Sequence, residues 1–394
     1  MNRTARSERY HIGIYGRRNA GKSSLINALA GQEVSIVSDI AGTTTDTVWK
    51  NIELPGIGAA VLADTAGYDD SGTLGEKRVN STRQSTIRID LALLLLDGTP
   101  TDTTHEKRWM ELFRSLDIPV ICLLGKSDTT AGTILEEWQR ELGEEILPIS
   151  PKSGEGIDTL LSRMSAIYKS GGNINDITHS LVKSGDTVVL VMPQDAQAPQ
   201  GRLIQPQVQT LRNLLDKQCL AMCCTPEKLP SMLKSLTTPP ALIITDSQVF
   251  PEVERLAPRE SRLTSFSILM ARHKGDIDEF RSGAEALMNI PADGSILIAE
   301  ACTHIPQNED IGRVKLPRLL RKKLGEGIKI EIVSGNNFPE NLSPYDIIIH
   351  CGACMFTRRH VLTRVRMAKA QEIPITNYGI AIAALTGILN KVEI

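Results

Sequence analysis

The sequence predicts an α/β protein whose sheets are mainly parallel. Short runs of β-branched and other apolar residues alternate with helix-length segments almost from end to end, which is the pattern of repeated strand–helix–strand units. The chain of 394 residues is long enough for two or three domains that each bury a core. The pattern breaks around residues 169–177 and again around 271–276, so we predict three units, 1–172, 173–272 and 273–394.

The strands are predicted where apolar runs end in turn residues. In the first unit the candidates are "YHIGIYG", "GAAVLADT", "DLALLLLD", "PVICLLGK" and "EILPIS". The second unit has "TVVLVMP", "LAMCC" and "ALIITD", with a helix near "PQVQTLRNLLDKQ". The third has "SILIAEAC", "KIEIV" and "YDIIIHC", with helices near "VKLPRLLRKKLG" and "TRRHVLTRVRMAKAQ".

The composition is that of an ordinary soluble globular protein. Hydrophobic residues make up 41% of the chain, charged residues 23%, and the formal net charge is −2, so no electrostatic feature indicates nucleic acid as a partner. The longest apolar runs, such as "LALLLL", are too short to cross a bilayer. The N-terminal stretch has no apolar segment of signal-peptide type. We therefore expect a cytoplasmic protein with no membrane partner.

A complete phosphate-binding motif lies between the first predicted strand and a predicted helix. The segment "GRRNAGKSS" (16–24) matches G-x-x-x-x-G-K-[ST]. Glycines allow successive backbone N–H groups to face phosphates, Lys22 reaches the terminal phosphates, and the Ser23 hydroxyl can bind Mg²⁺. The predicted phosphate site therefore comprises Gly16, Arg17, Arg18, Asn19, Ala20, Gly21, Lys22, Ser23 and Ser24.

Further motifs resemble the TrmE–Era branch of translation-factor-like GTPases. "DTAG" (64–67) ends a strand and places Asp64 where a carboxylate can hold Mg²⁺ through water. "DIAGTTTD" (39–46) resembles the switch I segment of this branch. The resemblance implies that Thr44, or alternatively Thr43, closes over Mg²⁺ and the γ-phosphate. It also groups Lys22, Thr44, Asp64 and Gly67 as the catalytic residues.

The resemblance extends to the segments that bind the base. "GKSD" (125–128) lies at the position of the family's N-K-x-D motif, and "SPKSGEG" (150–156) resembles its last base-contacting loop. Lys126, Asp128 and Ser150 are the implied contacts, with Asp128 accepting hydrogen bonds from the guanine N1 and N2 groups. GTP is therefore the expected nucleotide.

Three positions bear on how fast hydrolysis would be. Gly125 stands where the family has Asn, so one base contact is missing, and Tyr68 stands where Ras-like enzymes carry a water-orienting Gln. Asn19 resembles the residue that coordinates K⁺ in this branch, and a K⁺ beside the phosphates can neutralise transition-state charge. The resemblance implies slow hydrolysis that K⁺ stimulates.

Cysteines form a second pattern near the C-terminus. Seven are present, at positions 122, 219, 223, 224, 302, 351 and 354, and this odd number in a large chain argues against a disulfide framework. Cys302 and His304 form C-x-H, and residues 350–354 form H-C-x-x-C, each after an apolar strand. Parallel strands bring their carboxyl ends to one edge of the sheet, so the two halves can meet.

The residues alone leave three interpretations of this pattern open. The cysteines could be core residues, they could hold a structural Zn²⁺ with Cys₃His ligation, or three of them could hold an iron–sulfur cluster. Cys223 and Cys224, adjacent in a predicted strand, point to opposite faces and cannot easily share a metal.

Together the two patterns closely resemble the HydF family, the GTPases that mature iron–iron hydrogenases. The resemblance spans essentially the whole chain and implies an N-terminal P-loop GTPase domain (1–172) followed by two smaller α/β domains, one for dimerisation (173–272) and one that binds iron–sulfur (273–394). It implies a 4Fe–4S cluster on Cys302, Cys351 and Cys354. His304 or His350 would be a fourth ligand or a supporting residue, with Glu309, Asp310 or water as other candidates for the fourth position.

The resemblance also implies partners. These are a second copy of the chain, the radical-SAM maturases HydE and HydG, and the apo-hydrogenase HydA, which receives a diiron precursor. Two other functions stay open: an RNA- or ribosome-associated GTPase of the Era or TrmE kind with a structural zinc, and a general iron–sulfur carrier. The first predicts a KH-like loop or a basic, aromatic-rich surface, but the chain has only 6 Phe, 6 Tyr and 3 Trp and no such loop.

Overall fold

The computed structural model describes most of the chain. The described residues are 8–31, 48–65, 86–128, 132–170, 176–194, 201, 203–301, 311–335, 337–353 and 356–393. They form two compact units, Met1–Gly172 and Asn173–Ile394.

The first unit is built on a six-stranded sheet with the order β2-β3-β1-β4-β5-β6. Neighbouring strands are parallel except β2 and β3, which are antiparallel. The bounds are β1 (Tyr10–Gly16), β2 (Val48–Leu54), β3 (Gly58–Asp64), β4 (Leu91–Leu96), β5 (Val120–Leu124) and β6 (Ile146–Pro148). The five predicted strands are present. The edge strand β2 was missed because its polar, half-exposed sequence "VWKNIEL" lacks an apolar run.

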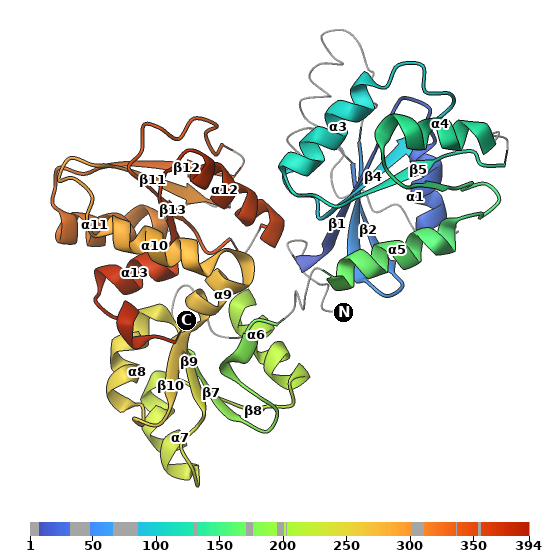
Figure 1. The fold of residues 1–394 in the computed structure, drawn as a ribbon. Helices are drawn as coiled ribbons and strands as arrows, with labels where there is room; N and C mark the ends of the chain where they lie inside the picture. The colour runs from blue at the N-terminus through green and yellow to red at the C-terminus, as the bar shows by residue number, and fades with distance from the viewer. Residues whose placement is uncertain are drawn as a thin grey trace. The chain divides into compact units, whose positions relative to one another are not determined.

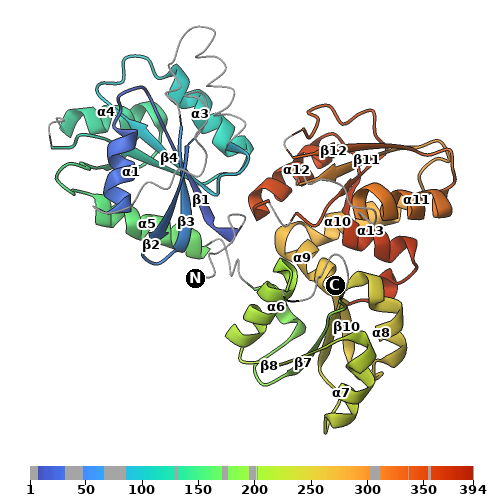
Figure 2. The ribbon, with the colours of Figure 1, turned by 180° about the vertical axis from the view of Figure 1, so that it is seen from behind.

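Helices cover both faces of this sheet (Figures 1 and 2). Leu25 of α1 and Met164 of α5 pack on one face, while Phe113 of α3 and Trp138 of α4 pack on the other. Because both faces are covered, every residue of β4 is buried. The helices are α1 (Lys22–Ala30), α3 (Thr104–Ser115), α4 (Gly132–Leu142) and α5 (Ile157–Ser170).

The second unit contains two four-stranded parallel sheets, with the orders β10-β9-β7-β8 and β12-β11-β13-β14. The first is formed by β7 (Thr187–Val191), β8 (Leu220–Cys224), β9 (Leu242–Thr245) and β10 (Arg262–Ser265). The second is formed by β11 (Ser295–Glu300), β12 (Lys329–Ser334), β13 (Ile347–His350) and β14 (Ile375–Asn377). The α/β class with mainly parallel sheets is therefore confirmed. The short strands β10 and β14 were not predicted.

Eight α-helices surround these sheets within the described part of the unit. They are α6 (Gln205–Asp216), α7 (Leu229–Ser235), α8 (Phe250–Leu256), α9 (Phe266–Lys274), α10 (Ile277–Leu287), α11 (Leu316–Leu324), α12 (Arg358–Ala370) and α13 (Tyr378–Leu385). A short π-helix, η5 (Ile311–Lys315), precedes α11, and 3₁₀ turns are η2 (His179–Leu181), η3 (Pro226–Lys228), η4 (Ser247–Val249) and η6 (Leu389–Lys391). Across the described residues, every helix is too short or too polar to traverse a lipid bilayer.

One apolar core joins the two sheets of the second unit. Val189 and Ile243 from the first sheet belong to the same buried cluster as Leu297 and Ile348 from the second. Helix α9 contacts α6 on one side and α12, α10 and α13 on the other. The boundary predicted at residue 272 falls inside α9, and the division of this unit into two domains stays a prediction.

Candidate functional site

The phosphate loop, residues 16–21, leaves the carboxyl end of β1 and leads into α1. Asn19 and Gly21 adopt left-handed backbone conformations, with φ values of 63° and 99°. A Cβ added at Gly16 would lie 2.6 Å from the backbone oxygen of Leu95. Glycine is therefore required at Gly16 for packing and favoured at Gly21 by conformation.

The Lys22 ammonium lies over this loop. Its Nζ donates hydrogen bonds to the backbone oxygens of Gly16, at 2.9 Å, and Arg17, at 2.7 Å. The side chain is largely buried, whereas Ser23 and Ser24 at the start of α1 are exposed. The loop therefore presents a positive charge and two hydroxyls, as the motif predicts for a phosphate and Mg²⁺ site.

Asp64 closes the strand next to the phosphate loop. Its Cα is paired with that of Ile14, two residues before Gly16. Burial raises the pKa of the Asp64 carboxyl, and the positive charges of Lys50 and Lys22 lower it again in part. The charge of Lys22 lowers the pKa of Asp64, so the two side chains belong to one electrostatic site. A cation bound there would offset the free-energy cost of burying the carboxylate.

The two base-side segments are tied to each other. The Ser127 N–H donates to the oxygen of Ile149 at 3.1 Å, and the Ser127 hydroxyl donates to Glu155 Oε2 at 2.9 Å. Lys126 has a left-handed φ of 60° and its Nζ donates to Asp97 at 2.8 Å. Asp128 is exposed. The structure therefore gathers Lys126 and Asp128 beside the loop at 150–156.

Ser150 has a different place from the other predicted base contacts. It is 1% exposed, and its hydroxyl accepts the N–H of Ser153 at 3.3 Å. Its contribution in this structure is to shape the loop. Gly125, the position that departs from the family pattern, packs on the phosphate loop, since a Cβ there would lie 3.3 Å from the oxygen of Ala20.

Arg17 was predicted to contact the nucleotide, but its guanidinium is directed to α3. It donates from Nε to Glu106 Oε1 at 2.7 Å and from Nη2 to Glu106 Oε2 at 3.1 Å, and also to the backbone oxygen of Asp102. Glu106 is 1% exposed, and such a bidentate pair fixes both groups. Glu106 is buried with Trp109 and Phe113 of this helix, but a glutamate on an amphipathic helix looks like a surface residue in the sequence.

The second candidate site lies at the carboxyl ends of β11 and β13. These strands are adjacent and parallel, with Ala299 paired with His350. Ala301, the residue before Cys302, donates its N–H to Cys351 Sγ at 3.0 Å. The strand that leads to the C-x-H half of the cysteine pattern therefore ends in contact with the H-C-x-x-C half.

Cys351 Sγ accepts a second backbone hydrogen bond. The N–H of Ala353 lies 3.4 Å from the sulfur, and Ala353 has a left-handed φ of 52°. N–H donors stabilise a thiolate over a thiol and are a common feature around cluster-bound sulfur. Cys351 is half-buried, so its environment suits a metal ligand.

His350 is enclosed behind Cys351. Its Nδ1 lies 2.8 Å from the backbone oxygen of Cys351, and its Nε2 lies 3.0 Å from Arg364 Nη1. Because a guanidinium can only donate, Nε2 accepts and Nδ1 carries the proton. Burial, together with the charge of Arg364, lowers the pKa of His350 to about 3. Both ring nitrogens are therefore engaged within the protein.

Arg364 is itself buried and held by aromatic rings. Its guanidinium carbon lies 4.7 Å from the centre of the Phe338 ring and 4.6 Å from that of Phe356. It also donates to the backbone oxygen of Gly335. Arg364 was not identified from the sequence, because an Arg in the basic helix "TRRHVLTRVRMAK" looks like a solvated side chain.

An ion pair brackets the segment that contains Cys302 and His304. Glu300, at the end of β11, is 3% exposed, and Arg313 of η5 donates to its Oε2 from Nε at 3.1 Å and from Nη2 at 3.0 Å. Ser334 donates to the same oxygen at 3.1 Å. The two ends of the segment are therefore fixed to each other.

Several predicted site residues lie outside the described residues. They are Thr43, Thr44, Gly67, Cys302, His304, Glu309, Asp310 and Cys354. Among the residues that the structure does describe, no group of three or more His, Cys, Asp or Glu side chains could hold a metal ion.

The remaining cysteines do not join either site. Burial raises the pKa of Cys122 to about 12 in the core of the first unit. Cys219 is buried in the second unit, Cys223 is exposed, and Cys224 is half-buried on the edge strand β8.

Family models match three stretches of the chain. Residues 11–126 match a model described as a 50S ribosome-binding GTPase. Residues 177–275 match the hydrogen maturase F dimerization domain, and residues 278–393 match the hydrogen maturase F tetramerization domain.

Curated relatives match a little more than a third of the chain. The tRNA modification GTPase MnmE of Pectobacterium carotovorum subsp. carotovorum (strain PC1) is 38% identical over 152 residues, which is 37% of this chain and 33% of that protein. MnmE of Yersinia pestis bv. Antiqua (strain Angola) is 39% identical over 155 residues, with the same coverage. The chain thus spans about a third of the length of these curated relatives.

Solved structures give weaker similarities. Aquifex aeolicus Era bound to GDP and AlF₄⁻ is 21% identical, with a TM-score of 0.34 over 62% of this chain and 97% of that one. The G domain of the T. maritima FeoB iron transporter is 21% identical, with a TM-score of 0.33 over 41% of this chain and 99% of that one.

The geometry and the family matches agree on the first unit. The glycine-shaped loop, Lys22 and Asp64 form a P-loop site within residues 11–126, so this unit is a GTPase domain that binds GTP and Mg²⁺. The two maturase models cover almost all of the second unit. The chain therefore belongs to the hydrogen maturase F family.

Proposed function

We propose that this protein is a GTP hydrolase and iron–sulfur scaffold that assembles or delivers the 2Fe subcluster precursor to an apo iron–iron hydrogenase. The observation that carries the proposal is the sulfur of Cys351, which accepts two backbone N–H groups at the edge where β11 leads to Cys302. The family to which the chain belongs supports the role in hydrogenase maturation.

Cys302, Cys351 and Cys354 would hold a 4Fe–4S cluster. The donor set suits one, since thiolates are the usual protein ligands of such clusters. When bound, the cluster supplies one iron that no cysteine holds and whose ligand can exchange. Because both nitrogens of His350 are engaged by Arg364 and by the backbone, we assign this histidine to support of Cys351. His304, Glu309, Asp310 and water remain candidates for the fourth position.

In the GTPase domain, water would attack the γ-phosphate of GTP. Lys22 would neutralise charge on the terminal phosphates, and Ser23, Thr44 and, through water, Asp64 would hold Mg²⁺. The exposed Asn19, with its left-handed backbone, would bind a K⁺ beside the phosphates. Thr43 and Gly67 complete the proposed contacts to the γ-phosphate, and Lys126 and Asp128 those to guanine.

The protein would act as a homodimer. The dimerization and tetramerization models support oligomerisation. Strand β8 lies at the open edge of its sheet, and Leu220 on it is 59% exposed, while Leu215 of the neighbouring helix α6 is 52% exposed. An open edge beside exposed leucines is a surface that a second chain can cover. By family resemblance the other partners are HydE, HydG and HydA in the cytoplasm.

Metal analysis tests this function most simply. The full chain, purified without oxygen, should contain iron and acid-labile sulfide and should absorb visible light. Replacing Lys22 by Ala should preserve that absorption while it removes GTP hydrolysis. A colourless protein with one zinc per chain would overturn the scaffold and favour an RNA-associated GTPase with a structural zinc.

A further inference from the structure

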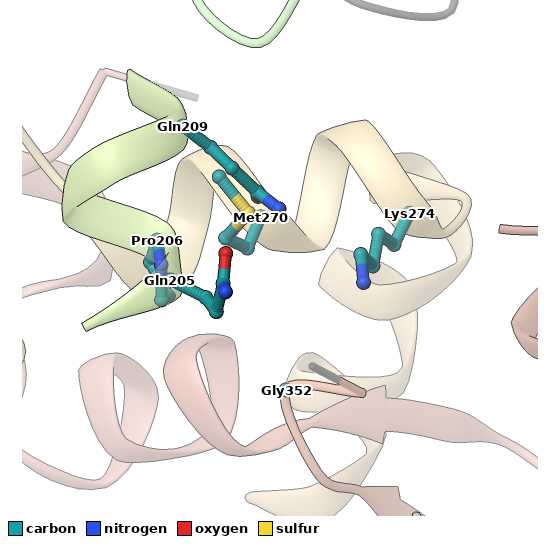
Figure 3. A pocket seen from close by; sticks show the side chains of 6 residues that line it. All are labelled: Gln205, Pro206, Gln209, Met270, Lys274 and Gly352. Carbon is teal, nitrogen blue, oxygen red and sulfur yellow. The ribbon is translucent and has the colours of Figure 1, made fainter. Parts of the chain in front are cut away.

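Lys274 connects α9 to the segment that follows β13. It is the last residue of α9 and is 5% exposed. Its Nζ donates to the backbone oxygen of Ala353 at 3.0 Å and to that of Phe356 at 3.1 Å. Lys274 and Gly352 line one shallow pocket together with Gln205, Pro206, Gln209 and Met270 (Figure 3).

Ala353 is the residue through which Lys274 can act on Cys351. The carbonyl of Ala353 accepts from Lys274, while its N–H donates to Cys351 Sγ at 3.4 Å. Its φ of 52° costs a residue with a Cβ about 1–2 kcal/mol. Such a conformation persists only where the surroundings fix it, and the ammonium of Lys274 is one of the groups that do so.

The chemistry of the contact explains why a lysine stands there. A buried ammonium is stable only where oxygen acceptors replace its water, and the two carbonyls provide them. Conversely, without the ammonium the carbonyls of Ala353 and Phe356 would each lose a hydrogen-bond donor while they remain buried. Such a loss costs about 1–3 kcal/mol for each carbonyl.

We propose that Lys274 is a positioning residue for Cys351, holding Ala353 in the conformation that aims its N–H at the sulfur. Lys274 lies in the part of the chain that matches the dimerization model, and Ala353 in the part that matches the tetramerization model. The contact therefore connects the part of the chain that matches the dimerization model to the cysteine site. The expected effect of Lys274 on a bound cluster rests on the proposed function, whereas its expected effect on the backbone conformation of Ala353 does not.

The direct test is hydrogen–deuterium exchange on the full-length protein without metal. In Lys274→Met, a peptide that contains Ala353 should exchange about tenfold faster than in the parent. In Lys274→Arg, which keeps the charge and donors, the rate should rise less. The control is Lys217→Met, because Lys217 is half-buried and pairs with Asp176 at 2.7 Å in the same unit.

Each outcome decides the proposal. An unchanged exchange rate in Lys274→Met would overturn it, and so would an equal increase in peptides from β7, which would indicate general loosening. If Lys274→Met does not fold, Lys274→Arg decides by whether its increase is confined to the Ala353 peptide.

A second measurement separates this proposal from the proposed function. After iron and sulfide are incorporated, the reduction potential of the cluster in Lys274→Met should fall, since hydrogen bonds to sulfur favour the reduced state and the Ala353 N–H would be held less firmly at Cys351. Lys217→Met should leave the potential unchanged. If the parent protein binds no iron, the scaffold function fails, yet the exchange experiment still decides the role of Lys274.

Discussion

The phosphate loop of the first unit and the segment after β13 in the second occupy equivalent places, each at the carboxyl end of a buried parallel strand. In both, a lysine donates two hydrogen bonds to backbone oxygens, Lys22 in the first and Lys274 in the second. In both, a residue with left-handed backbone shapes the turn, Gly21 and Ala353 respectively.

The two regions differ in where the lysine comes from. Lys22 lies six residues from Gly16, whereas Lys274 lies 79 residues from Ala353. A local lysine produces a sequence motif, and a distant one does not. Similar loop chemistry can therefore be evident in the sequence of one unit and have no local sequence signal in the other.

The largest expected effect separates the two lysines by function. Lys22→Ala should lower the rate of GTP hydrolysis about hundredfold or more, because no ammonium would then neutralise the negative charge on the γ-phosphate. Phosphate release measures this, and Lys107→Ala in the exposed pair with Glu141 is the control. Lys274→Met should hydrolyse GTP at the same rate as the parent protein. A Lys22→Ala protein with parental turnover would contradict the assignment of the phosphate site.

The next effect concerns the ion pair that joins Arg17 of the phosphate loop to Glu106 of α3. Glu106→Gln should lower the free energy of unfolding of the first unit by about 2 kcal/mol, because the Arg17 guanidinium loses its charged, bidentate partner. Urea unfolding measures the change. Glu144→Gln removes the partner of Arg114 in an exposed pair and should change little. Equal effects of the two substitutions would mean that the Arg17 anchor contributes nothing special.

Acidification should weaken the cysteine region through His350. Its folded pKa of about 3 lies below the usual value, so between the two pKa values the unfolded chain binds a proton that the folded chain does not. Stability should therefore fall as the pH falls from about 6.5, by at most about 1.4 kcal/mol per pH unit.

His350→Gln should flatten this dependence in denaturant unfolding of the metal-free protein. His273, whose burial lowers its pKa to about 4, contributes with the same sign, so His273→Gln measures its share separately. If the slope is the same in the parent and in His350→Gln, the buried neutral histidine is not what responds to pH.

The smallest effect is a reciprocal exchange between the two loops. Gly21→Ala should destabilise the first unit by about 1 kcal/mol, since alanine is strained at a positive φ and glycine is not. Ala353→Gly should change the second unit little, because relief of the positive φ is offset by the loss of a methyl group that is buried in the core. Space is not the reason at Gly21, where the nearest atom to an added Cβ is 3.8 Å away. Thermal unfolding of both variants measures the two changes in stability. A stabilising Gly21→Ala would contradict the role given to the positive φ.

The sequence predicted the elements whose signals are local. The five core strands of the first unit were readable as apolar runs, and the phosphate loop as a motif. Strands β2, β10 and β14 were missed because they are polar or only a few residues long. Helices α7, α8, α9, α10 and α13 were missed because the sequence analysis did not separate them from the neighbouring apolar runs.

In the candidate sites, the residues missed were those that act across the fold. Glu106 and Arg364 are charged side chains on helices that read as ordinary surface, and only tertiary packing buries them. The pairing of the Arg17 guanidinium with Glu106 of α3 also depends on tertiary packing. The positions of Cys302, His304 and Cys354, together with those of Thr43, Thr44 and Gly67, lie outside the described residues and stay predictions.

The cluster assignment is tested most directly by iron and sulfide content in two matched cysteine variants. Cys351→Ser removes the sulfur that accepts the N–H groups of Ala301 and Ala353, whereas Cys223→Ser removes an exposed sulfur on β8. After anaerobic reconstitution, we expect Cys351→Ser to lose most of its iron and sulfide and Cys223→Ser to match the parent. Full iron and sulfide content in Cys351→Ser would contradict the account.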